Sequence, residues 1–205
     1  MRRLAIVGAS GHGKVVADCA EVCGWDEVVF FDDAWPARAA LAHWSVEGNA
    51  EVLLSRLDEF QGVVVAIGNN AIRRDKCMLL VQAGASLVNI VHPSATISRY
   101  AQMGNGTVVF AGAVVNMDAQ LGMGCIVNTG ACIDHDCLLG DFVHVSPNAA
   151  LAGGVTVGDL SWIGMGAVAR PLVHIGREAL IGAGAAVVSD VPENATVVGV
   201  PAKPI

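Results

Sequence analysis

The sequence predicts a small α/β domain followed by a parallel β-helix. Two observations support this prediction. An aliphatic residue returns at every sixth position from residue 91 onward, and five glycines in the same region lie 18 residues apart. Before residue 90 this repeat is absent, and apolar strands alternate with helical stretches. We therefore place the α/β domain at residues 1–90, the β-helix at 91–192 and a C-terminal tail at 193–205.

The hydrophobic pattern predicts the α/β domain element by element. An apolar strand leads into a glycine-rich loop and then a helix, which Gly24 ends. Two further strands follow, and the second leads into another helix and a last short strand. In chain order, these strands and helices are expected at residues 3–7, 14–22, 28–31, 62–67, 70–82 and 87–90. Residues 34–58 show no pattern that predicts an element.

The repeat predicts the β-helix because it runs without a gap. Seventeen positions, six residues apart, begin at Val91 and end at Val187, and only Ala169 is a weak member. A small or β-branched residue follows each of them after four residues. Eighteen residues are three hexapeptides, so each coil should contain three short strands and a corner that requires glycine. The aliphatic side chains then fill the interior of five to six stacked coils. The glycines lie at residues 104, 122, 140, 158 and 176.

Composition excludes several classes of protein. The 205 residues are 54% hydrophobic, but no stretch approaches ~18 uninterrupted apolar residues, so no membrane partner is expected. The six apolar residues from Leu4 to Ala9 are too few for a secretory signal, and we expect a cytoplasmic protein. A net charge of −7 disfavours nucleic acid as a partner. The six cysteines form no C-x-x-C pair and are expected to be reduced thiols.

A nucleotide is the ligand predicted for the α/β domain. The glycine-rich loop follows a strand and opens a helix, where backbone N–H groups and the helix dipole favour a phosphate. Two carboxylates end the next strand about 20 residues later, where an acid would meet a ribose or base. Ser10 departs from the G-x-G-x-x-G pattern, so a tight turn without a ligand remains the alternative. The candidate ligands are Gly11, His12, Gly13, Asp32, Asp33, Gly68 and Asn69, although His12 could equally pack on the helix.

A polar cluster interrupts the apolar repeat at residues 134–136, which read Asp-His-Asp. A cluster of this kind indicates a functional site, although a solvated corner would look the same. Adjacent side chains of a strand point to opposite faces, so direct contact between His135 and Asp136 requires a corner or irregularity. His144 lies nine residues, or half a coil, from His135, so these two histidines should meet only across a subunit interface. His174 stacks with neither of them.

The repeat resembles that of the hexapeptide-repeat acyltransferases, which are trimers with active sites between neighbouring left-handed β-helices. Nearly the whole chain resembles a narrower branch, the bacterial acetyltransferases of nucleotide-linked amino sugars and the related sialic acid O-acetyltransferases. The resemblance implies a Rossmann-like α/β domain, a left-handed parallel β-helix and a homotrimer. The segments that carry it are GASGHG at 8–13, FDD at 31–33, AIGNN at 66–70, NIVHP at 89–93, NT at 128–129, DHDC at 134–137 and VGVPAK at 198–203.

The resemblance also implies roles for individual residues. His135 would be the general base, and Asp136, which is Glu in some members, would raise its basicity. The first loop, with Asp32 and Asp33, would hold the nucleotide-sugar. Acetyl-CoA, the co-substrate, would be contacted by His144 and by the backbone at Met165 and Ala183.

A metal site is not expected. Some hexapeptide β-helices are zinc-dependent carbonic anhydrases, whose ligands include two histidines separated by four residues. This chain has no such pair, and Cys125 and Cys137 fall on the interior positions of the repeat.

We therefore expect an acetyl-CoA-dependent N-acetyltransferase that modifies the C4 amine of a nucleotide-linked 4-amino-4,6-dideoxy sugar. A UDP-linked sugar of the bacillosamine type is favoured, and its product would enter glycan assembly. GDP-perosamine is the next candidate, and sialic acid O-acetylation is the alternative within the branch. Outside it, an NAD-dependent oxidoreductase would leave about 100 residues of repeat unexplained. A non-catalytic β-helix scaffold would give the polar cluster no chemical role.

Overall fold

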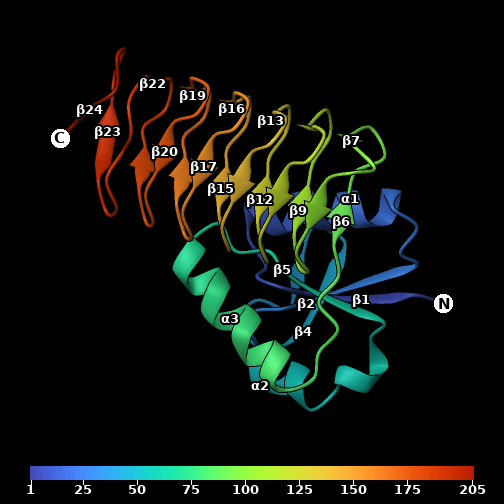
Figure 1. Ribbon diagram of the computed structural model, residues 1–205. Coiled ribbons are helices and arrows are strands. Elements are labelled where there is room, and N and C mark those ends of the chain that lie inside the picture. The colour runs from blue at the N-terminus through green and yellow to red at the C-terminus, as the bar shows by residue number, and fades with distance from the viewer. The chain divides into compact units, whose positions relative to one another are not determined.

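A computed structural model describes residues 1–205, and the chain divides into two compact units, Met1–Pro93 and Ser94–Ile205 (Figure 1). The first unit contains a five-stranded sheet with helices, and the second is a stack of short coils. No helix combines the length and apolarity that crossing a membrane would require.

The sheet of the first unit has the strand order β3-β4-β2-β1-β5. Its three inner connections are parallel, whereas β3 pairs antiparallel with β4 at the edge. The central strands are nearly continuous apolar runs because both faces of a parallel sheet are buried. The elements are β1 (Arg3–Val7), α1 (Gly11–Val22), β2 (Glu27–Phe31), β3 (Ala40–Leu41), β4 (Trp44–Gly48), α2 (Ala50–Leu54), a 3-10 turn (Leu57–Glu59), β5 (Gly62–Val65), α3 (Asn70–Gln82) and β6 (Ile90–Val91).

The segment without a sequence pattern, residues 34–58, contains β3, β4 and α2. Strand β4 alternates buried and more exposed residues, as an edge strand does. The Asn49 side chain begins α2 by accepting a hydrogen bond from the N–H of Val52 at 3.1 Å. Two further differences concern predicted bounds, because β5 ends at Val65 and the last strand lies at Ile90–Val91.

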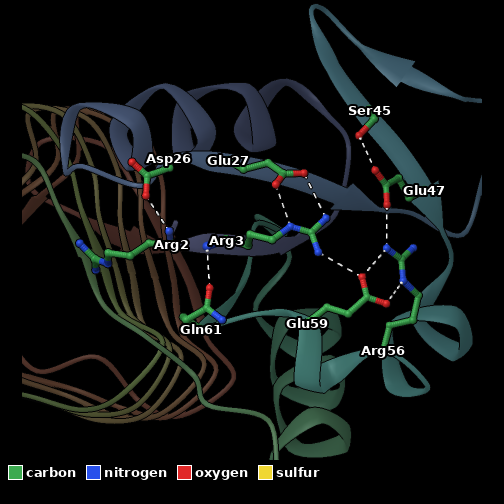
Figure 2. Close-up of polar contacts among 9 residues, drawn as sticks. All are labelled: Arg2, Arg3, Asp26, Glu27, Ser45, Glu47, Arg56, Glu59 and Gln61. Carbon is green, nitrogen blue, oxygen red and sulfur yellow. Dashed lines mark hydrogen bonds and ion pairs between the residues drawn. The ribbon is translucent and has the colours of Figure 1, made fainter.

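An ion-pair network joins several segments of the first unit at the amino-terminal end of β1 and β2 (Figure 2). Arg3 binds Glu27 at 2.7 Å and Glu59 at 3.1 Å. Arg56 binds Glu59 at 2.7 Å and Glu47 at 2.9 Å. The network therefore connects the starts of the two central strands to β4 and to the turn before β5.

The second unit is a parallel β-helix in which every coil strand is two or three residues long. In the coils, each strand pairs with the strand 18 residues further along the chain, as Cys132 does with Ala150. The first column contains β7 (Thr96–Ile97), β10 (Val114–Val115), β13 (Cys132–Ile133), β16 (Ala150–Leu151), β19 (Val168–Ala169) and β22 (Ala186–Val187). The second contains β8 (Gln102–Met103), β11 (Gln120–Leu121), β14 (Leu138–Leu139), β17 (Thr156–Val157) and β20 (His174–Ile175).

The third column extends into the segment expected as a tail. Its strand β23 pairs parallel with β21, and β24 turns back to pair antiparallel with β23. The strands of this column in the second unit are β9 (Val108–Val109), β12 (Ile126–Val127), β15 (His144–Val145), β18 (Trp162–Ile163), β21 (Leu180–Ile181), β23 (Thr196–Val198) and β24 (Lys203–Pro204).

The six-residue repeat forms the interior of this β-helix. Its aliphatic residue is the second residue of each strand, whose side chain points inward, whereas the first residue points outward. In β14, for example, Leu139 is 5% exposed and Leu138 is 45% exposed. The small residues at the other repeat position, such as Ala131 and Cys137, are fully buried. The parallel β-helix predicted from the repeat is confirmed.

The five glycines with 18-residue spacing are required by close approach of the next coil. A Cβ on Gly104 would lie 2.5 Å from the backbone N of Met123, and one on Gly122 would lie 2.7 Å from that of Asp141. None of the five has a positive φ. Left-handed backbone occurs instead at the second residue of the turns, including Asp136.

Candidate active site

His135 and Asp136 form the turn between β13 and β14. Asp136 has a φ of 58°, a left-handed conformation that aspartate tolerates better than most residues. This corner brings the two adjacent side chains to the same side, and His135 Nδ1 lies 2.7 Å from Asp136 Oδ2. The direct contact that the sequence left open is therefore present.

A second carboxylate supports the same corner. Asp134 accepts the backbone N–H of His135 at 2.8 Å and the side-chain amide of Asn116, one coil earlier, at 2.9 Å. These hydrogen bonds lower the pKa of Asp134. The hydrogen bond with Asp136, followed by the negative charge of Asp134, raises the pKa of His135 above its ordinary value of 6.5.

A cavity of about 350 Å³ opens beside this pair. The side chain of His135 is 60% exposed, so its ring is reachable from solvent. One coil further along, Gly153 lies against the ring, since a Cβ there would be 2.5 Å from both Cε1 and Nε2. The lining residues are Asp134, His135, Asp136, Ala152, Gly153, Gly154, Pro171 and Leu172.

The residues expected to contact acetyl-CoA lie elsewhere on the β-helix. His144 begins β15 in the third column, is 6% exposed and stacks on Trp162 with ring centroids 4.7 Å apart. Ala183 lines a cavity of about 210 Å³, and Met165 is 59% exposed on the turn after β18. One chain does not bring these residues to His135, which lies at the corner between the first and second columns.

In the first unit, both candidate aspartates bind protein groups. Asp32 accepts the N–H of Ala9 at 2.6 Å and that of Ala34 at 2.9 Å. Asp33 forms an ion pair with Lys76 at 2.7 Å. These carboxylates and Lys76 line a cavity of about 90 Å³ at the carboxyl ends of β1 and β2.

The glycine-rich loop leads into α1, which begins at Gly11. A side chain on Gly13 would overlap the carbonyl of Gly8, so glycine is needed for the close packing of helix and strand. Burial and then the positive charge of Arg73 lower the pKa of His12 to about 4, so its imidazole is neutral near pH 7.

The second candidate loop is held by hydrogen bonds within the unit. Arg73 donates to the carbonyl of Gly68 at 3.1 Å. The Asn69 side chain accepts the N–H of Ile72 at 3.0 Å and so begins α3.

Comparisons with known proteins identify the family. A profile described as the PglD N-terminal domain matches residues 3–79. The acetyltransferase domain of PglB from Neisseria gonorrhoeae FA1090, solved with acetyl coenzyme A, is 44% identical with a TM-score of 0.96, and the match covers 100% of this chain and 99% of that one. The chain belongs to the hexapeptide-repeat nucleotide-sugar N-acetyltransferases.

Two other family members are similar to this chain. A mutant of perosamine N-acetyltransferase from Caulobacter crescentus, solved with CoA and GDP-perosamine, is 39% identical with a TM-score of 0.95 and covers 100% of this chain and 97% of its own. The UDP-N-acetylbacillosamine N-acetyltransferase of Bacillus subtilis (strain 168) is 36% identical over 113 residues, which are 54% of this chain. That match spans about half of the curated relative, 52% of its length.

In this member of the family, sequence reasoning missed two cations near the glycine-rich loop and the aspartates. Arg38 donates a hydrogen bond to the carbonyl of Ala9, and Lys76 pairs with Asp33. Lys76 follows Asn69 by seven residues, two helical turns, and this spacing could have identified it. Arg38 lies in the segment without a pattern, so no signal pointed to it. No three His, Cys, Asp or Glu side chains are arranged to hold a metal ion.

Proposed function

We propose that this protein transfers the acetyl group of acetyl-CoA to the C4 amine of a nucleotide-linked 4-amino-4,6-dideoxy sugar. The observation that carries the proposal is the 2.7 Å contact between His135 and Asp136 beside an open cavity. The favoured substrate is a UDP-linked sugar of the bacillosamine type, in line with the name of the curated relative. GDP-perosamine is the second candidate because a relative of 39% identity was solved with it.

His135 acts as the general base in this reaction. The Asp136 carboxylate can only accept, so Nδ1 carries the proton and Nε2 presents its lone pair to the cavity. The amine attacks the thioester carbonyl while Nε2 takes its proton; the C–N bond forms and the C–S bond breaks. CoA leaves as the thiolate, which recovers the proton from the imidazolium. No covalent intermediate on the protein is needed once amine and thioester are positioned.

The nucleotide-sugar binds at the carboxyl ends of the strands in the first unit. Backbone N–H groups of Gly11, His12 and Gly13 face the diphosphate at the start of α1. The neutral imidazole of His12 adds no charge there. Asp33 and Lys76 offer an acceptor and a donor to the base or ribose. Asp32 acts mainly by holding the loop, through the N–H of Ala9.

Acetyl-CoA binds at His144, Met165 and Ala183 of a neighbouring subunit in a homotrimer. Support comes from the separation of His144 and His135 on different sides of one β-helix. A site that needs both groups is incomplete without a second copy. All six cysteines are free thiols, which agrees with a cytoplasmic enzyme.

The test is release of free CoA thiol with a panel of UDP- and GDP-linked 4-amino-6-deoxy sugars, with CMP-sialic acid and free sialic acid as further acceptors. We expect turnover on one amino sugar and a loss of roughly 10²–10⁴-fold in His135→Ala. His174→Ala, which removes an exposed histidine of the second column, is the matched control and should keep full activity. Turnover on sialic acid alone would instead make the protein an O-acetyltransferase, and silence on every acceptor would refute the proposal.

A further inference from the structure

We propose that Gly153 is a positioning residue, which holds the imidazole of His135 against Asp136 by leaving room for the ring one coil further along the β-helix. This inference rests on the proposed function, in which His135 is the base. It assigns a role to a residue that has no reactive side chain.

The contact between Gly153 and the ring is close. Gly153 follows His135 by 18 residues and takes the same place at the next corner. A Cβ built on Gly153 would lie 2.5 Å from Cε1 and Nε2 of His135 and 3.2 Å from Cδ2. Such distances are far inside van der Waals contact, so any side chain at residue 153 would claim the volume that the ring now fills.

The backbone does not explain why this residue is glycine. Gly154, the second residue of the turn, has a φ of 69° and therefore favours glycine, but Gly153 has no positive φ. At this first turn position, Met117 lies one coil earlier and Pro171 one coil later. Glycine at residue 153 is therefore required by the ring above it and not by the turn.

A methyl group at residue 153 would move the ring more easily than it would move the coil. The ring lies at the end of a flexible side chain that is 60% exposed, whereas Gly153 lies in a backbone hydrogen-bonded to the next coil through Leu172. Rotation of the ring away from the methyl group would break its 2.7 Å bond with Asp136. Gly153→Ala should thus keep the fold and lose the orientation of the base.

The first experiment measures Gly153→Ala by thermal unfolding, by acetyl transfer and by NMR titration of the histidines, with His135→Ala to assign the signal. We expect an unchanged melting temperature, a fall in kcat of at least about tenfold and a lower His135 pKa, which moves the acid limb of the pH–rate profile to lower pH. Met117→Ala, at the same corner position one coil earlier, should change none of these. A normal kcat, or a lower kcat with an unchanged His135 titration, would overturn the inference.

The second experiment tests whether Gly153 acts through His135. In the His135→Ala background, Gly153→Ala should cause no further loss of residual activity, because the ring it would displace is absent. An equal fold-loss in both backgrounds would overturn the inference. If the wild-type protein turns over no acceptor, the proposed function fails, whereas the titration of His135 in Gly153→Ala still decides the role of Gly153.

Discussion

The contact between His135 and Asp136 depends on one backbone angle. In an extended strand, neighbouring side chains diverge, but the φ of 58° at Asp136 brings them together at the corner. The shorter aspartate therefore reaches the imidazole although some family members carry glutamate there. Both residues could be identified from the polar cluster. Their contact could not, because it depends on the position of the corner relative to them.

Asp136→Asn should lower kcat by less than the roughly 10²–10⁴-fold expected for His135→Ala. It removes the hydrogen bond that contributes most to the raised His135 pKa. Only the neutral imidazole accepts a proton, so the rate should rise with pH through the His135 pKa, and this acid limb should move to lower pH in the variant. A pH–rate profile of kcat measures both effects.

Asp118 provides the matched control for this substitution. It takes the same place one coil earlier, with a φ of 59°, but follows Met117 instead of a histidine. Asp118→Asn should leave the rate and the acid limb unchanged. Equal effects of the two substitutions would attribute the loss to the corner geometry and not to the base.

The two aspartates of the first unit show where residue-level reasoning reaches its limit. Their position after a strand was sufficient to predict them as candidates, but their hydrogen-bonding partners were not predictable. Asp32 binds Ala34, and Arg38 returns to the carbonyl of Ala9, through a segment without periodicity. Such contacts depend on loop geometry, which hydrophobic patterns do not encode.

At the scale of elements, the repeat was informative because each strand contributes one residue to the interior. Leu139→Ala should cost about 2–5 kcal/mol of stability, since it removes a buried side chain and leaves a cavity. Leu138→Ala, in the same strand but 45% exposed, should cost much less. Urea unfolding followed by circular dichroism compares them, and equal costs would contradict the inward direction assigned to the repeat residue.

The ion-pair network of the first unit predicts sensitivity to acid. Its arginines, Arg56 first and then Arg3, lower the pKa of Glu59 from 4.5 to about 2. A lowered carboxyl pKa adds stability above pH 4.5, and this stability is lost as the pH falls from 4.5 towards 2. Glu59→Gln should therefore be less stable near pH 7 and lose less stability on acidification.

Urea unfolding at several pH values, followed by tryptophan fluorescence, checks this prediction because three of the four tryptophans belong to the first unit. Glu51→Gln, which changes an exposed carboxylate of α2 without an ion pair, is the control. A pH dependence in Glu59→Gln identical to that of the wild-type protein would remove the network from the explanation.

Elements without a repeat were predicted less well. Strands β1, β2 and β5 were identifiable because central parallel strands are continuous apolar runs. Strands β3 and β4 lie at the edge of the sheet and alternate only weakly, so residues 34–58 showed no period. The 18-residue glycines were found from spacing, but the approach of the next coil, which explains them, needed the structure.

At the scale of the whole molecule, the proposed trimer can be tested with two inactive variants. His135→Ala and His144→Ala chains, unfolded together and refolded as mixed trimers, should regain activity because some interfaces then combine both intact histidines. Random mixing in a cyclic assembly should restore roughly a quarter of the sites. Thiol release measures the recovery. No recovery in trimers verified by mass spectrometry would mean that one chain supplies both groups.

The column arrangement of the coils also limits how the length of this unit can change. Insertion of one hexapeptide would move every later residue to the next column, so residues that now form the corner after the first column would form the corner after the second. Insertion of 18 residues would lengthen the stack by one strand spacing, about 4.8 Å, and leave every side chain on its face. Natural or engineered variants of this half should therefore differ in length by whole coils, with shorter insertions confined to the turns.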